Sequence, residues 1–183
     1  TETLKPWDLG YDPTLSLSSG VALPISDQLE KASRVFEQLS PKLAIHFQRM
    51  RDESLIDLEN RKGKAAGAYC TSFPDEKRVV IFCNSVGDSD DVSTLMHEMG
   101  HAFQGWESQW IDLVELRSPS YDACEVHSMG MEFLSQRHLN EFFSPEDLQK
   151  FCRYRWREAI SLICYVCVVD EFQFCEEEED GIK

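Results

Sequence analysis

The most informative segment of this 183-residue chain reads Leu95-Met96-His97-Glu98-Met99-Gly100-His101-Ala102-Phe103. Its apolar residues recur at the period of an α-helix, and acidic residues precede it, as is typical of the positive end of a helix. We therefore predict a largely buried helix that begins near Asp90 or Asp91 and ends at Gly105. Glycine costs a helix about 1 kcal/mol relative to alanine, so Gly100 indicates that another backbone passes close to this helix.

Within this helix, His97, Glu98 and His101 form the pattern H-E-x-x-H. Helix positions four apart differ by about 40° in azimuth and about 6 Å in height, so both imidazoles can reach one metal ion. Zinc suits such a site because it accepts imidazole and carboxylate ligands in a tetrahedral arrangement. Glu98 would lie beside the metal, where it can take a proton from a zinc-bound water as general base. The pattern also arises by chance, so a helical interaction module with a fortuitous H-E-x-x-H stays an alternative.

A catalytic zinc site needs a third protein ligand, and Glu125 on the next predicted helix is the candidate. Glu132 lies two turns further along the same face, and we expect it to hydrogen-bond a ligand or the backbone. The alternative for each is an ordinary exposed acid on a helix. His127 is a rival ligand, but it would point about 160° away from Glu125 on the same helix.

The remaining patterns predict a mainly α-helical α+β fold with one β-hairpin. Two β-rich runs flank a Pro-Asp turn, and the other apolar periodicities are helical. The predicted helices span residues 27–39, 41–58, 121–138 and 145–174, the predicted strands span 68–73 and 78–84, and residues 59–64 form a charged turn.

Size and composition predict a single domain over residues 1–183, with an irregular lead-in at 1–23 and an acidic tail at 176–183. The formal net charge of −15 disfavours nucleic-acid and membrane-surface partners. Seven cysteines are an odd number without a disulfide spacing, and the chain shows no signal peptide or membrane-spanning run. These features predict reduced thiols and a cytoplasmic location. The pair Cys164 and Cys167 lies in an apolar run and is expected in a buried helix rather than in a redox or metal site.

Several segments together resemble the thimet-oligopeptidase family of zinc metallopeptidases, on the oligoendopeptidase F side. The resemblance extends over nearly the whole chain and is carried, besides the H-E-x-x-H helix, by residues 4–9, 57–70, 125–132 and 168–173. It implies a zincin-like helical catalytic core with the hairpin beside the active-site helix. It also implies cytoplasmic hydrolysis of oligopeptides with one zinc ion per chain, held by His97, His101 and Glu125, and with Glu98 as general base.

The same resemblance implies that a peptide substrate adds as a strand beside the hairpin, with Gly67, Ala68 and Tyr69 as candidate binding residues. Ala68 stands where the family tends to have glycine, and His127 where it tends to have a small residue. The chain is shorter than family members and lacks their C-terminal His and Tyr segment, so we expect a catalytic-core fragment or a truncated relative. The alternative function is a zinc-binding but catalytically incomplete fragment, which would self-associate as a homo-oligomer or bind the missing segments.

Overall fold

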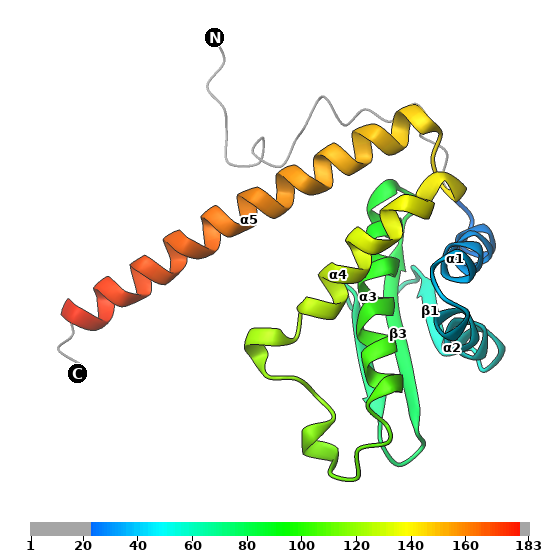
Figure 1. The fold of residues 1–183 in the computed structure, drawn as a ribbon, viewed down its shortest axis with the longest axis horizontal. Coiled ribbons are helices and arrows are strands. Elements are labelled where there is room, and N and C mark those ends of the chain that lie inside the picture. Colours follow the sequence, from blue (N-terminus) through cyan, green and yellow to red (C-terminus); the bar gives the residue numbers. More distant parts are fainter. Residues whose placement is uncertain (1–22, 180–183) are drawn as a thin grey trace. The chain divides into compact units, whose positions relative to one another are not determined.

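The computed structural model describes residues 23–179, with side chains described as far as residue 175. The described chain forms two compact units, which join at Ser144 and Pro145. The first unit holds a three-stranded sheet and the helices around it, and the second is the single helix α5 (Pro145–Glu179) (Figure 1). Nearly all of the predicted lead-in at residues 1–23, and the last residues of the predicted acidic tail, lie outside the described residues. The single domain over residues 1–183 stays a prediction, whereas the mainly helical α+β fold is confirmed.

The first two helices are separate elements, as the sequence predicted, and they pack against each other. Helix α1 (Ile25–Leu39) ends at the extended residue Ser40, and α2 (Pro41–Asp52) begins directly with its proline. Phe36 and Phe47 join them through rings whose centroids are 4.9 Å apart. The prediction that the second helix continues to residue 58 is wrong.

Helix α2 ends at Asp52 because the chain turns through Ser54, whose φ of 54° lies in the left-handed region. The residues that follow form strand β1 (Ile56–Glu59), which pairs in parallel with β3 (Arg78–Ser85). This pairing joins residues more than twenty positions apart, so the local apolar pattern does not reveal it.

The predicted hairpin is confirmed as β2 (Tyr69–Phe73) and β3, which pair in an antiparallel register. The strand order is β1-β3-β2, so one edge of β2 has no strand beside it among the described residues. The loop between β1 and β2 is held to the end of β3 by side chains. The Lys64 ammonium donates to the carbonyls of Asp57 and Glu59, and the Asn84 amide donates to the carbonyls of Ala65 and Gly67.

Helix α3 (Ser89–Glu107) is the central element of the first unit, because it packs against the sheet and against α4 (Val126–Ser135) (Figure 1). Asp88 caps its N-terminus by accepting hydrogen bonds from the backbone of Asp90 and Asp91. Toward the other end, a Cβ on Gly105 would lie 3.0 Å from Ser72 Oγ and 3.1 Å from a Val79 methyl group. A small residue is therefore needed where α3 meets the sheet.

The predicted helix at 121–138 is divided in the structure. A 3₁₀ turn at Tyr121–Ala123 comes first, then α4, and then a second 3₁₀ segment at Gln136–Glu141. In the first turn, Ala123 N donates to Ser120 O, three residues back, as in a 3₁₀ helix. The four-residue spacing of an α-helix begins where Met129 N donates to Glu125 O. Glu125 consequently stands at the very start of α4.

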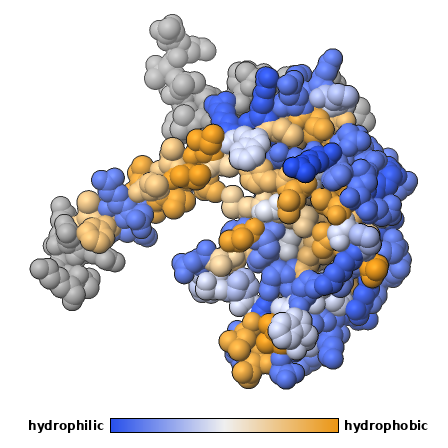
Figure 2. Space-filling model, viewed as in Figure 1, coloured by the Kyte–Doolittle hydropathy of each residue, from blue (hydrophilic) through white to orange (hydrophobic). Residues whose placement is uncertain are grey.

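Helix α5 begins where the sequence predicted, and it continues to Glu179 instead of ending near Phe174. Glutamate is a good helix former, which accounts for helix in the first part of the predicted acidic tail. The prediction that Cys164 and Cys167 are buried is wrong for this chain, because both are exposed. Their apolar neighbours Ile163 and Val166 are exposed too, and Figure 2 shows this apolar surface along α5. None of the described helices is both long enough and apolar enough to span a membrane.

The packing of α3 on α4 makes a prediction for Gly100. A Cβ at this position would lie 2.5 Å from the His127 carbonyl oxygen and 2.6 Å from the Ser128 Cα, which are backbone atoms that cannot rotate away. We expect Gly100→Ala to lower the free energy of unfolding by about 3 kcal/mol or more, measured by denaturant unfolding.

Gly130→Ala is the matched control, because no atom of the described residues that could clash lies within 4 Å of a Cβ added to this glycine of α4. This change should stabilise the protein by about 1 kcal/mol through helix propensity alone. Equal effects of the two substitutions would contradict the close approach of α3 and α4.

Candidate metal centre

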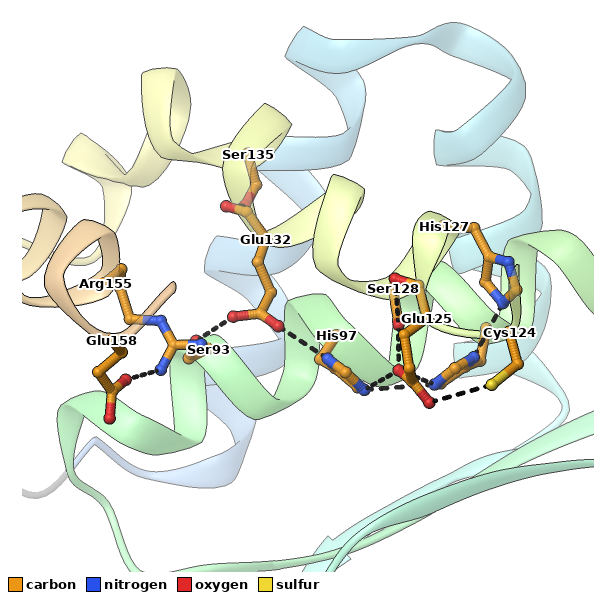
Figure 3. Close-up of polar contacts among 11 residues, drawn as sticks. Ser93, His97, Cys124, Glu125, His127, Ser128, Glu132, Ser135, Arg155 and Glu158 are labelled. Atoms are coloured by element: carbon orange, nitrogen blue, oxygen red, sulfur yellow. Dashed lines mark hydrogen bonds and ion pairs between the residues drawn. The ribbon is translucent and has the colours of Figure 1, made fainter. Parts of the chain in front are cut away.

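The structure brings His97, His101 and Glu125 together at one point. Figure 3 shows the side chains of His97 and Glu125 pointing toward one another. The Nε2 atoms of the two histidines are 3.2 Å apart on successive turns of α3. Glu125 Oε2, from the start of α4, lies 3.1 Å from His97 Nε2 and 3.3 Å from His101 Nε2. Ligands about 2.0–2.1 Å from a tetrahedral zinc would be about 3.3–3.4 Å from one another. The triangle of these three atoms therefore fits one face of a tetrahedral metal site.

The carboxylate of Glu125 is kept ionised by its neighbours. Ser128 Oγ donates a 2.6 Å hydrogen bond to Glu125 Oε2, and the Cys124 thiol lies 3.7 Å from Oε1. The hydrogen bond from Ser128 is the main reason that the pKa of Glu125 lies below its ordinary value, and the two imidazoles add to it. An ionised carboxylate beside two imidazole nitrogens is a suitable donor set for a divalent cation.

Glu132 lies on the side of His97 that faces away from this triangle. Its Oε1 is 2.7 Å from His97 Nδ1, and its Oε2 accepts a 2.9 Å hydrogen bond from Ser93 Oγ. The side chain of Glu132 is 9% exposed, and its hydrogen bond is the main reason that the pKa of His97 is raised. A carboxylate can only accept, so Nδ1 is the protonated nitrogen of His97 in this hydrogen bond, and in the neutral ring Nε2 is then the nitrogen that can bind a metal.

His127 contacts the corresponding nitrogen of the other histidine. Its Nε2 lies 2.9 Å from His101 Nδ1, with the two rings nearly perpendicular at 80°. His127 therefore faces the nitrogen of His101 that points away from Glu125, and its ring does not enter the triangle. Burial lowers the pKa of both His101 and His127 and so favours the neutral imidazoles.

Glu98 is buried on the α3 helix beside these residues. Its side chain is 6% exposed, and its Oε2 has no hydrogen-bond partner among the described residues. Burial is the main reason that the pKa of Glu98 is raised. A buried carboxylate without a partner is costly unless a proton, a water molecule or a substrate group satisfies it.

A cleft of about 870 Å³ is lined by the three candidate ligands and by Glu98 and His127. Its floor is α3 from His97 to Gly105, one wall is the free edge of β2, and the other wall is the chain segment 114–121. Of the three residues predicted to bind substrate, Ala68 and Tyr69 line this cleft, whereas Gly67 is not part of the lining. Their role in substrate binding stays a prediction. Gly67 has a φ of 96° and serves the turn before β2.

The cleft wall formed by residues 114–121 is held in place by hydrogen bonds to backbone carbonyls. Gln104 of α3 donates a 2.7 Å hydrogen bond to the Arg117 carbonyl, and Arg117 Nε donates one of 2.8 Å to the Ile111 carbonyl. The bond from Gln104 ties this segment to the helix that carries the histidines, and the bond from Arg117 closes the segment on itself. No sequence signal marks them, because backbone acceptors are the same at every residue.

A helix-borne H-E-x-x-H with a carboxylate from the next helix, in a cleft beside a small sheet, is an arrangement typical of the core of metal-dependent hydrolases. The chain belongs to peptidase family M3, whose family model matches residues 30–157. The resemblance to oligoendopeptidase F is thereby confirmed, since the chromosomal oligoendopeptidase F of Lactococcus lactis subsp. cremoris is 37% identical over 81 residues. That match covers 42% of this chain and 13% of the relative.

Solved structures agree with this assignment. A putative oligoendopeptidase F from Bacillus anthracis str. Ames is 34% identical with a TM-score of 0.82, and the match covers 94% of this chain and 31% of that one. PZ peptidase A, solved with an inhibitor, is 39% identical with a TM-score of 0.77, and the match covers 83% of this chain and 27% of that one. This chain therefore spans less than a third of each of these relatives.

The contact between Ser128 and Glu125 predicts a pH-dependent effect. A metal held by Glu125 competes with a proton, and Ser128→Ala raises the pKa of Glu125 because it removes the main cause of the lowering. We expect the variant to lose metal affinity mainly near pH 5, close to the ordinary glutamate pKa of about 4.3, and much less near pH 7. Chelator competition at the two pH values measures this difference.

Ser135→Ala is the matched control, because among the described residues the hydroxyl of this buried serine of α4 donates to the backbone carbonyl of Glu132 and not to a carboxylate. It should leave the pH dependence of metal affinity unchanged. The same acid shift in both variants would refute the specific role of Ser128.

Proposed function

We propose that this chain holds one zinc ion through His97, His101 and Glu125 and hydrolyses peptide bonds within oligopeptides. The observation that carries the proposal is the triangle of ligand atoms at 3.1 Å, 3.2 Å and 3.3 Å within the cleft. Membership of peptidase family M3 and the likeness to oligoendopeptidase F support peptides as the substrate class. The activity is a proposal because the chain spans only part of these relatives.

Zinc is the ion that this donor set favours. Two imidazole nitrogens and one carboxylate oxygen are the three protein ligands of many catalytic zinc sites, which leave a fourth position open. When bound, zinc supplies Lewis acidity, which polarises a carbonyl group and lowers the pKa of water.

Glu98 is the proposed general base. Its buried carboxylate has an oxygen without a hydrogen-bond partner among the described side chains and backbone, and burial raises its pKa. Such a group can accept a proton from the attacking water and later deliver it to the nitrogen of the leaving amine. The raised pKa suits both halves of this transfer.

The free edge of β2 is the proposed binding site for the peptide backbone. An unpaired strand edge presents N–H and C=O groups that an extended peptide can pair with. The cleft volume of about 870 Å³ is sufficient for a short peptide segment. Ala68 and Tyr69 line the start of this edge, and Phe73 lines its far end.

We also propose a reducing, cytoplasmic compartment, with oligopeptides rather than nucleic acids or membranes as partners. All seven cysteines are free, which is the usual state in a reducing compartment. The net charge of −15 opposes binding to polyanions.

A zinc-binding but catalytically incomplete core is the second candidate. The exposed apolar side chains of α5 favour it, because such surfaces in proteins are usually covered by a partner or by another copy of the chain. Concentration-dependent self-association with bound zinc and no peptide cleavage would select this candidate.

The substitution Glu98→Gln tests the proposed chemistry. The amide cannot accept the proton, so we expect peptide cleavage to fall at least about 100-fold while zinc stays bound. Cleavage of a quenched fluorescent peptide measures the first effect, and elemental analysis of the purified protein measures the second.

Glu115→Gln is the control, because this exposed acid lines the same cleft and is no part of the ligand triangle. It should retain both zinc and cleavage. Unchanged turnover in the Glu98 variant would rule out its role as general base.

A further inference from the structure

We propose that His127 is a positioning residue. Its Nε2 accepts a hydrogen bond from the Nδ1–H group of His101, which leaves the Nε2 lone pair of His101 directed toward the metal. The inference rests on the proposed zinc site and adds a residue to it. It also gives a role to a histidine that the ligand triangle leaves out.

The geometry allows only one of the two nitrogens of His101 to bind the metal. Nε2 lies 3.2 Å from His97 Nε2 and 3.3 Å from Glu125 Oε2, so it is the nitrogen within the triangle. Nδ1 lies on the other side of the ring, 2.9 Å from His127 Nε2. The two nitrogens of His101 therefore have separate partners.

This arrangement determines where the protons lie when the metal is bound. A neutral imidazole carries one proton, and the nitrogen that binds a metal must be free of it. The proton of His101 must then be on Nδ1, which donates to His127 Nε2, and His127 must carry its own proton on Nδ1. The opposite assignment would place a proton on His101 Nε2 and block the ligand.

The backbone explains why His127 is in reach. Its carbonyl oxygen lies against Gly100, where an added Cβ would approach it to 2.5 Å. Gly100 directly precedes His101, so the close contact between α3 and α4 places the His127 ring beside the His101 ring. A larger residue at position 100 would separate the two imidazoles.

The two histidine ligands then have different supports. His97 donates to the carboxylate of Glu132, which itself is held by Ser93. His101 donates to a neutral imidazole, which is a weaker acceptor than a carboxylate. His127 thus acts as a hydrogen-bond acceptor at a fixed distance from His101. Another side chain of similar length that carries an acceptor atom should be able to take its place.

The experiment compares His127→Leu with His127→Gln. Leucine fills a similar volume without an acceptor, whereas the Gln side-chain carbonyl can accept the His101 proton from a similar distance. Zinc affinity is measured by chelator competition, and the thermal unfolding of the metal-free variants is measured beside it. We expect zinc affinity to fall about 10- to 100-fold in the Leu variant and to stay within about threefold of the parent chain in the Gln variant.

Each outcome of the comparison has one meaning. Equal loss of zinc affinity in both variants would overturn the proposal, because the acceptor would then not be what matters. Parental zinc affinity in the Leu variant would overturn it as well. A thermal shift of the metal-free Leu variant, with parental zinc affinity, would show a merely structural histidine. Failure of the parent chain itself to bind zinc would overturn the proposed function, which distinguishes that failure from failure of this inference.

Discussion

The close contact between α3 and α4 at Gly100 is the constraint on which the site depends. One glycine lets the backbone of His127 and Ser128 lie against α3 at a distance that a Cβ would not permit. Because α4 starts at this point, Glu125 reaches both histidines at the level of their Nε2 atoms. The ligand triangle is therefore a consequence of backbone packing and not only of side-chain type.

Each member of the triangle has a partner that sets its chemical state. Glu132 and His127 face the outer nitrogens of His97 and His101, and Ser128 donates to Glu125. All three partners come from α4, and the candidate ligand Glu125 directly precedes this helix. One helix and its first flanking residue therefore supply a candidate ligand and the groups that orient the candidate ligands of α3. Glu98 differs from these groups because it is buried and one of its oxygens has no partner in the described part of the chain. The three partnered side chains are therefore suited to holding a metal, whereas Glu98 is suited to accepting and donating a proton.

The surroundings of the site follow from the sheet and the segment opposite it. Strand β2 lies at the edge of the order β1-β3-β2, and Lys64 and Asn84 hold the loop that leads into it. Gln104 ties the opposite wall to α3, and Arg117 bonds a carbonyl within that wall. A strand edge that faces such a wall across the candidate metal ligands is an arrangement that suits an extended peptide.

Much of this protein could be predicted from the sequence because its decisive signals are local. The spacing of His97 and His101 places both on one side of a helix, and the acidic start and the Gly-containing apolar run locate that helix. The hairpin and the first helix are also predictable from the sequence, because a Pro-Asp turn and a regular spacing of apolar residues depend only on neighbouring residues. Glu125 and Glu132 could be selected as candidates because they recur along one helix face. What the tertiary structure alone decided are the contacts between distant segments. These contacts include the parallel pairing of β1, which ended α2 early, and the division of the helix after Ser120 that put Glu125 at the start of α4. They also include the place of His127 against His101, because the meeting of two side chains from different helices depends on how closely the backbones pack and not on either segment by itself.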